Sequence, residues 1–196
     1  MNAERKREFV GTVLITTMLA ALYGIIHDQI TVRISAPYFT VWHPPVFGTD
    51  DPVLVALGWG VLATWWMGAG LGGLFGLAAA WNPMKPSMCP WRVLRRTAWV
   101  FAASAAAAAL AGLLAVAVRF EAPSFVMGSA IARLGASERL AFSVCLAIHN
   151  TSYNAAFIAS LVAARRIWLE RNRRCSCGGR CSLQRSRRDG RDAPPD

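Results

Sequence analysis

The sequence has few charged residues: Asp, Glu, Lys and Arg make up 16% of its 196 residues, against about 25% in typical soluble domains. Acidic residues are the scarcer kind, with 11 against 21 Lys and Arg, and the formal net charge is +10. Hydrophobic residues make up 55% of the chain. This balance excludes a disordered acidic chain and an ordinary soluble enzyme. It favours an integral membrane protein, and with no recognisable nucleic-acid-binding domain we expect no nucleic acid as a partner.

Compact enzyme motifs are also lacking. The chain has no P-loop, no dinucleotide-binding glycine pattern after a strand, no Gly-x-Ser-x-Gly and no His-Glu-x-x-His, which are the signatures of several large enzyme classes. Five cysteines in 196 residues are too few for a disulfide-dense secreted domain. These absences make an enzyme a weaker expectation without excluding one.

Four apolar blocks come close to the length of about 20 residues that crosses a bilayer. The expected spans are 10–27, 53–80, 98–118 and 140–164. The expected connections are an external loop over 28–52, a cytoplasmic loop over 81–97 and an external loop over 119–139. Residues 1–9 and 169–196 form polar tails, of which the second is expected to be disordered. The sequence therefore predicts an all-α membrane protein, a four-transmembrane-helix bundle over residues 10–168.

Two of the blocks allow other interpretations. The first follows a basic N-terminus like that of a signal peptide, but Tyr23 to His27 form a poor small-x-small cleavage site, which favours a retained anchor. The fourth is the most polar, because residues 149–154 read His-Asn-Thr-Ser-Tyr-Asn. The alternative is a protein with three spans, or one whose fourth block is re-entrant. The uncharged second and third blocks argue against a soluble bundle, whose surface helices need a polar stripe.

Lys and Arg are distributed unevenly along the chain. Seventeen of the 21 lie in the N-terminal tail, in the loop over 81–97 or beyond residue 164, and only Arg33, Arg119, Arg133 and Arg139 lie in the other two connections. Because positive residues stay on the cytoplasmic side, this alternation predicts a multi-pass protein of the bacterial inner membrane with both termini in the cytoplasm.

Small residues at a spacing of four occur in the second and third blocks. In lipid such residues let helix backbones approach closely. We expect an antiparallel contact between these two helices, and homo-oligomerisation through one ridge is the alternative. The residues expected at this contact are Gly68, Gly72, Gly76, Ser104, Ala108 and Gly112.

The first external loop carries a pattern with a period of two. Ile30, Val32 and Ile34 alternate with polar residues, which allows a short external β-hairpin between helices 1 and 2, with the segment 38–42 as its return strand. Asp50 or Asp51 is expected to cap the second helix, with Pro52 at its first position.

Polar and ionisable residues gather at the external ends of helices 1 and 4 and in the loop between helices 1 and 2. Because ionisable groups within spans are costly, they are functional candidates by default. The expected polar cluster comprises His27, Asp28, Gln29, Tyr38, His43, His149, Asn150, Tyr153 and Asn154. Histidine and carboxylate are common ligands of zinc and related divalent metals. The candidate metal ligands are therefore His27, Asp28, His43 and His149, with hydrogen bonding between helices as the alternative role.

The C-terminal tail contains Cys175, Cys177 and Cys181 among ten arginines that begin at Arg165. Three thiols fall one short of a closed zinc site, which Cys89 would have to complete. We expect instead that the arginine-rich tail is drawn to anionic lipids of the bilayer.

Residues 27–31, His-Asp-Gln-Ile-Thr, followed by Tyr-Phe-Thr at 38–40, resemble a motif of uncharacterised bacterial integral membrane proteins. Residues 60–66 are similar to a Gly-x-x-Ala-Thr-Trp-Trp-like run in that family, and residues 149–153 to its late His-Asn-x-Ser-Tyr motif. The chain departs from the pattern at Ala36-Pro37, where the family has Pro-Glu. The resemblance implies that the external loop and the polar patch of helix 4 form one unit, but it names no substrate.

Three functional hypotheses remain open on the sequence. The first is a structural or binding role through the outer-facing polar cluster. The second is a membrane-embedded metal-dependent enzyme or metal handler. The third is a small oligomeric transporter or channel whose path is lined by His149, Asn150 and Asn154.

Overall fold

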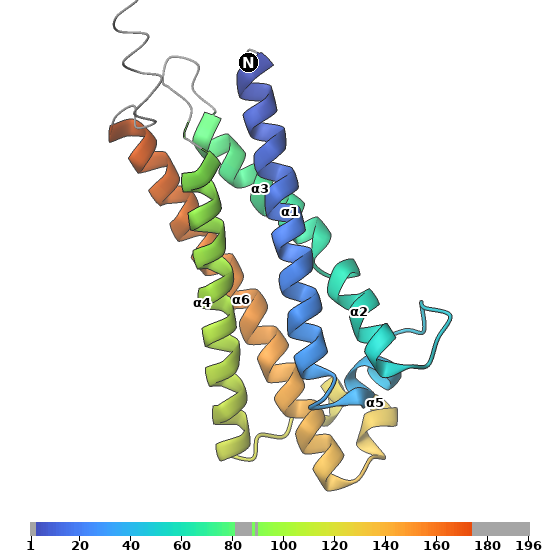
Figure 1. The fold of residues 1–196 in the computed structure, drawn as a ribbon. Helices are drawn as coiled ribbons and strands as arrows, with labels where there is room; N and C mark the ends of the chain where they lie inside the picture. Colours follow the sequence, from blue (N-terminus) through green and yellow to red (C-terminus); the bar gives the residue numbers. More distant parts are fainter. Residues whose placement is uncertain (1–2, 81–87, 89, 174–196) are drawn as a thin grey trace, which may run out of the picture.

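The structure, a computed structural model, describes residues 3–80, 88 and 90–173. Every regular element of the described residues is a helix. These are α1 (Ala3–Thr31), a π-helix η1 (Tyr38–Trp42), α2 (Pro52–Leu62), α3 (Trp65–Ala80), α4 (Pro90–Ala117), α5 (Ser124–Ala132) and α6 (Ala136–Arg173). Figure 1 shows α1, α4 and α6 as long rods side by side, with α2 and α3 end to end as a further rod. We call the end where α1 begins the amino end and the other the distal end.

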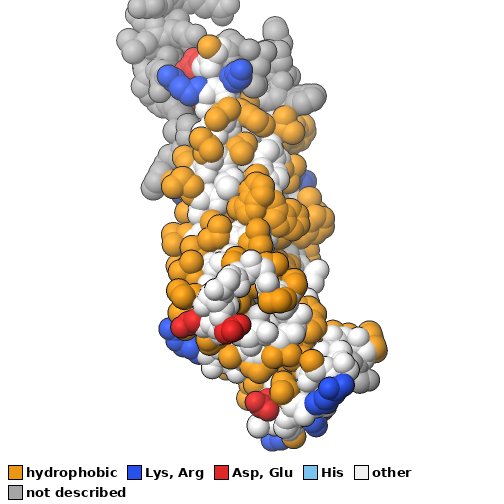
Figure 2. Space-filling view, turned by 90° about the vertical axis from the view of Figure 1, so that its right-hand side faces the viewer, with side chains coloured by type: hydrophobic (Ala, Val, Ile, Leu, Met, Phe, Trp, Pro, Cys, Tyr) orange, Lys and Arg blue, Asp and Glu red, His pale blue; other side chains and the backbone are white. Residues whose placement is uncertain are grey.

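Three helical segments are long and apolar enough to cross a membrane: Ala3–Thr31, Pro52–Ala80 and Arg92–Ala117. Figure 2 shows hydrophobic side chains covering the middle of one face, with charged side chains toward its two ends. Such an apolar band between polar ends is what a bilayer requires. The described chain is therefore all-helical, with three candidate membrane-spanning helices. Its first helix begins at Ala3, so most of the expected tail over 1–9 is helical.

The span over Pro52–Ala80 starts with the expected cap and is broken in its middle. The Asp51 carboxylate accepts hydrogen bonds from the amides of Val53 and Leu54, and Pro52 is the first helical residue. At the break, the Thr64 hydroxyl donates to the Gly60 carbonyl, and the Thr64 amide donates to Val61 instead. A side chain that takes the i−4 carbonyl in this way bends a helix.

The external β-hairpin is not formed, and residues 28–52 contain no strand. The amide of Val32 donates to the Asp28 carbonyl and that of Ser35 to the Thr31 carbonyl, so helix-type hydrogen bonds continue past the end of α1. Val32 is buried whereas Ile30 and Ile34 are exposed. A strand would have put Ile30, Val32 and Ile34 on one face, and in the structure they do not share a face. The segment expected as the return strand forms η1.

The glycine ridge of α3 packs against α1. A Cβ atom built on Gly68 would lie 2.6 Å from the Ala20 Cβ, and one built on Gly72 would lie 2.7 Å from the Val13 Cα. Neither could be accommodated without moving the backbones apart. The matching surface on α1 is a buried stripe of small or polar residues spaced about one turn apart, namely Thr12, Thr16, Ala20, Gly24, Asp28 and Thr31.

The ridge of α4 faces α6. A Cβ on Gly112 would meet the Ile148 side chain at 2.9 Å, and the Ser104 hydroxyl donates to the Ser152 carbonyl at 2.6 Å. Residues of both ridges therefore make contacts between helices. The predicted contact of the second span with the third is wrong, because α3 packs on α1 and α4 on α6. A stripe of small residues permits close approach by any neighbouring helix, so it does not determine which helix packs against it.

Three further segments differ from the expected boundaries. The cytoplasmic loop expected over 81–97 contains the start of α4, which begins at Pro90. The second external loop contains α5 and the first turn of α6. At the other end, α6 continues to Arg173, so residues 169–173 are helical rather than disordered. The predictions for Cys89, Cys175, Cys177 and Cys181 lie outside the described residues.

Candidate functional site

The buried stripe on α1 includes an acidic residue, Asp28, inside the distal end of the bundle. Asp28 follows Gly24 by one turn and is 6% exposed. Gly24 has no side chain because the Gly60 carbonyl of α2 would lie 2.1 Å from its Cβ. This close contact fixes the rotation of α1, and with it the inward direction of Asp28.

Asp28 meets a histidine of α6. Nε2 of His149 lies 3.1 Å from Oδ1 of Asp28, and both side chains are less than 10% exposed. Nδ1 of His149 lies 2.9 Å from the Cys145 carbonyl oxygen. Because a carbonyl only accepts hydrogen bonds, Nδ1 carries the proton and donates it there. Nε2 is therefore the nitrogen that faces the carboxyl group.

His27 lies beside this pair. Its ring is 4.6 Å from the His149 ring, edge to face. Its Nε2 is buried and makes no hydrogen bond with any described residue. One ligand atom each from His27, Asp28 and His149 lies within 4.8 Å of the others. These three residues are the candidate metal centre, and we call them the His-Asp-His cluster.

Tyr38 of η1 separates the fourth candidate ligand from this cluster. Its ring stacks on His149 at 4.5 Å and contacts His43 at 4.9 Å. Nδ1 of His43 donates to the Tyr38 carbonyl at 2.7 Å. Burial lowers the pKa of His43 and raises that of Tyr38. His43 is thus a neutral neighbour on the far side of an uncharged tyrosine, and it is not part of the close group formed by the described ligand atoms.

Toward the middle of the bundle a hydroxyl chain continues from the cluster. The Tyr23 ring lies 5.6 Å from the His27 ring, and its hydroxyl is 2.7 Å from the Ser152 hydroxyl, which lies 3.3 Å from that of Ser104. The Tyr153 ring is 6.5 Å from the His149 ring and 36% exposed. These contacts tie α1, α4 and α6 together below the cluster.

Three residues expected in the polar cluster lie elsewhere. Asn150 and Asn154 are exposed and bond to each other along the outside of α6, with the Asn154 amide donating to the Asn150 carbonyl. Gln29 donates to the Val53 carbonyl at 2.9 Å and ties the end of α1 to α2. His149 and the two asparagines therefore lie on different faces of α6 within one chain.

Cys145 is a site residue that the sequence did not single out. Its carbonyl orients His149, its Sγ is 3.7 Å from His149 Nδ1, and it is fully buried. The signal was its position four residues before His149, which places it on the same helix face.

Comparison with models of known protein families, with curated proteins and with solved structures found no match. The class of this protein therefore rests on its own fold, a helical protein with three candidate membrane spans and a His-Asp-His cluster near one end.

Proposed function

We propose that this protein binds a divalent transition metal ion of the zinc type at His27, Asp28 and His149. The observation that carries the proposal is the unpartnered Nε2 of His27, buried beside the His149–Asp28 pair. A buried polar atom without a partner costs about 1–3 kcal/mol. A metal ion held by the three residues would remove that cost by using the Nε2 lone pair.

The spacing of the three side chains supports such a centre. Metal–nitrogen bonds of about 2.0–2.1 Å in a tetrahedral site place ligand atoms roughly 3.3 Å apart. Nε2 of His149 and Oδ1 of Asp28 are already 3.1 Å apart. The ligand atom of His27 lies within 4.8 Å of both, so a small side-chain rotation would bring it to the same spacing.

The donor set favours zinc and its neighbours over magnesium or calcium, because imidazole suits transition metals and the lighter ions prefer oxygen. The hydrogen bond from His149 Nδ1 to the Cys145 carbonyl is typical of metal-binding histidines, whose second nitrogen is fixed in this way. Three protein ligands leave a coordination position for water or substrate, as in catalytic zinc sites. The ion would supply Lewis acidity at that position.

We also propose that α6 is the fourth span of a four-helix bundle. It is 38 residues long and runs beside α4 in Figure 1. Its buried polar residues, which include Ser143, His149 and Ser152, lower its hydropathy but lie inside the bundle. The distribution of Lys and Arg then supports both termini in the cytoplasm and the cluster near the outer surface of the bacterial inner membrane.

The test is the metal content of the full chain purified in detergent. The protein is loaded with Zn²⁺, freed of excess ion by gel filtration and analysed by elemental mass spectrometry. We expect about one zinc per wild-type chain and loss of most of it in His27→Ala and His149→Ala. The matched control is His43→Ala, which removes a histidine from the same end of the bundle and should retain zinc.

Two results would contradict the proposal. One is a wild-type protein that holds no zinc after loading. The other is equal zinc loss in His43→Ala and His149→Ala, because the structure separates His43 from the cluster by the Tyr38 ring. Helix content measured by circular dichroism distinguishes loss of ligands from loss of fold.

A further inference from the structure

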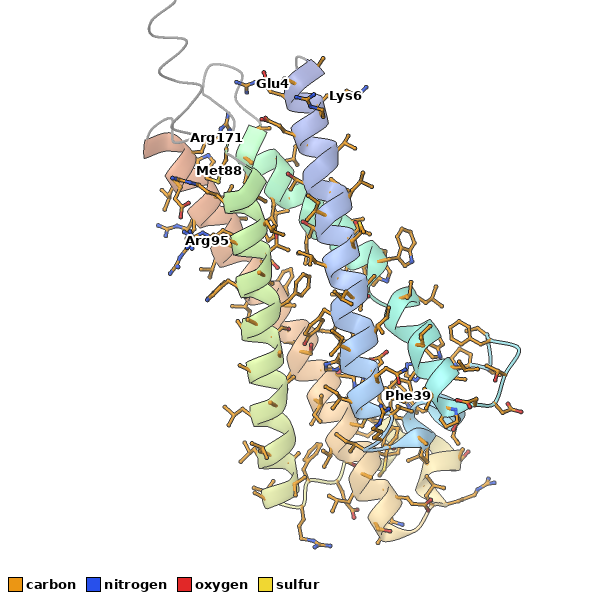
Figure 3. The ribbon with its side chains drawn as sticks, in the orientation of Figure 1. Glu4, Lys6, Phe39, Met88, Arg95 and Arg171 are labelled. Carbon is orange, nitrogen blue, oxygen red and sulfur yellow. The ribbon has the colours of Figure 1, made fainter. Side chains whose placement is uncertain are left out.

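A cavity of about 450 Å³ lies between α4 and α6 at the amino end, remote from the His-Asp-His cluster. Figure 3 shows Arg95 at the same end of the molecule as Glu4 and Lys6, with Phe39 at the other. The volume of the cavity lies within the range of ordinary ligand sites. The residues that line it are Arg92, Arg95, Arg96, Ala98, Trp99 and Glu170.

The spacing of the arginines on α4 produces this concentration of charge. Arg95, Arg96 and Trp99 lie three, four and seven residues after Arg92, which places the four on one face of a helix. Arg166 of α6 adds a guanidinium whose central carbon is 5.8 Å from the centre of the Trp99 ring. It also lines a smaller adjoining pocket with Arg96 and Glu170.

One acidic residue balances part of this charge. Glu170 forms an ion pair with Arg96. Neither Arg92 nor Arg95 forms an ion pair with a carboxylate of the described chain. Four arginines against one glutamate leave an excess of three positive charges around one small cavity, which is costly unless an anion is present.

We propose that this cavity binds the phosphate group of an anionic phospholipid. The planar guanidinium fork binds phosphate oxygens in pairs. The cavity lies at the start of the candidate span Arg92–Ala117, where lipid headgroups meet a spanning helix, and Trp99 belongs to the residue type that concentrates at this level. Basic pockets between spanning helices hold such headgroups.

The same face of α4 suits the acyl chains. Leu110, Leu113 and Leu114 are each more than half exposed, and they lie 18, 21 and 22 residues after Arg92, which places them on the helix face that carries the arginines. A headgroup in the cavity would thus leave its chains against an apolar surface. This inference does not depend on the metal site, which lies at the distal end.

Native mass spectrometry of the detergent-purified chain tests the proposal, with phosphatidylglycerol as the anionic probe and phosphatidylcholine as the zwitterionic one. We expect wild type to retain phosphatidylglycerol preferentially. Arg92→Gln/Arg95→Gln should lower its apparent affinity about tenfold or more, since each cation near the surface contributes to lipid binding. Glu170→Gln should raise it, because the substitution removes the negative charge of the cavity.

The matched control is Arg7→Gln/Arg165→Gln, which removes two exposed arginines at the same end, neither of which lines the cavity. It should bind phosphatidylglycerol as wild type does. Equal loss in the two double variants would overturn the proposal, since binding would then follow net charge alone. An unchanged affinity in Glu170→Gln would also count against it, even if the arginine variant fails to fold.

Inorganic phosphate serves as the competing probe. If the lipid is the ligand, millimolar phosphate should leave retained phosphatidylglycerol unchanged, because the acyl chains add contacts that the free ion lacks. Displacement by phosphate at that concentration would assign the cavity to a free phosphate and overturn the lipid assignment.

Discussion

Nε2 of His149 lies 3.1 Å from Oδ1 of Asp28, although 121 residues separate them in the chain. The pair joins the first and last long helices of the bundle at a buried point. The two side chains lie within hydrogen-bonding distance, and the Cys145 carbonyl holds the histidine in the orientation that makes this contact.

Breaking the pair from one side should cost more than removing it altogether. His149→Leu leaves the Asp28 carboxyl group buried without its partner and is expected to lower the free energy of unfolding by about 3 kcal/mol. In Asp28→Leu/His149→Leu the loss should be smaller than in His149→Leu alone, because no unpaired carboxyl group remains buried. The measurement is unfolding in mixed detergent micelles with a chelator present, so that metal binding does not contribute. Additive losses would show that the two side chains are not coupled.

Two adjacent glycines of α3 should differ sharply in their tolerance of a side chain. Gly72→Val places its Cβ 2.7 Å from the Val13 Cα and is expected to destabilise the α1–α3 contact by about 1–3 kcal/mol. Gly73→Val is the matched control, because a Cβ there meets nothing within 4 Å. Thermal unfolding of both variants in detergent checks the prediction, which is wrong if they lose stability equally.

Acidification should destabilise the loop that carries His43. Burial lowers the pKa of His43 below its ordinary value of 6.5, and its bond to the Tyr38 carbonyl only partly opposes this shift. The unfolded chain then binds the proton more readily than the folded one. Stability is therefore full above pH 6.5 and falls as the pH drops through 6.5 toward the lowered folded value.

The comparison of wild type with His43→Gln isolates this effect from the other histidines. Between pH 7.5 and 5.5 the melting temperature of wild type should fall more than that of the variant. Equal falls in the two proteins would show that His43 is not the group responsible.

The proposed topology predicts which loops are accessible from outside the cell. In a chain whose five native cysteines are replaced, single cysteines at Gly48 and Gly135 should react with a membrane-impermeant maleimide in intact spheroplasts. A cysteine at Arg7 should react only after lysis. Labelling at residue 7 in intact spheroplasts would reverse the orientation, and opposite accessibility of 48 and 135 would mean that they lie on different sides.

Local signals in the sequence predicted the helical elements well. Composition and block length indicated an all-helical membrane protein, and three of the four expected spans fall on helices that are long and apolar enough to cross a bilayer. Asp51 and Pro52 start α2 as expected. These features depend on residues close together in the chain, such as a carboxylate and the amides two and three positions later.

The candidate site could be predicted only in part. His27, Asp28 and His149 were among the candidates and lie together, but His43, Gln29, Asn150 and Asn154 lie outside the close group. One residue along a helix, a rotation of about 100°, separates an inward position from an outward one, and only the rotation of α6 decided that His149 is buried while Asn150 is exposed.

The sequence by itself determined the helical composition, the approximate spans and the presence of ridges of small residues. Only the tertiary structure decided that α3 packs on α1 and α4 on α6, that the first external loop forms a π-helix instead of a hairpin, and that Asp28 meets His149. The physical reason is that apolarity and residue size set how a helix can pack. The helix against which it packs depends on how well two surfaces from distant parts of the chain fit together. Gly24 and Gly60 are an example, because their backbones are in close contact.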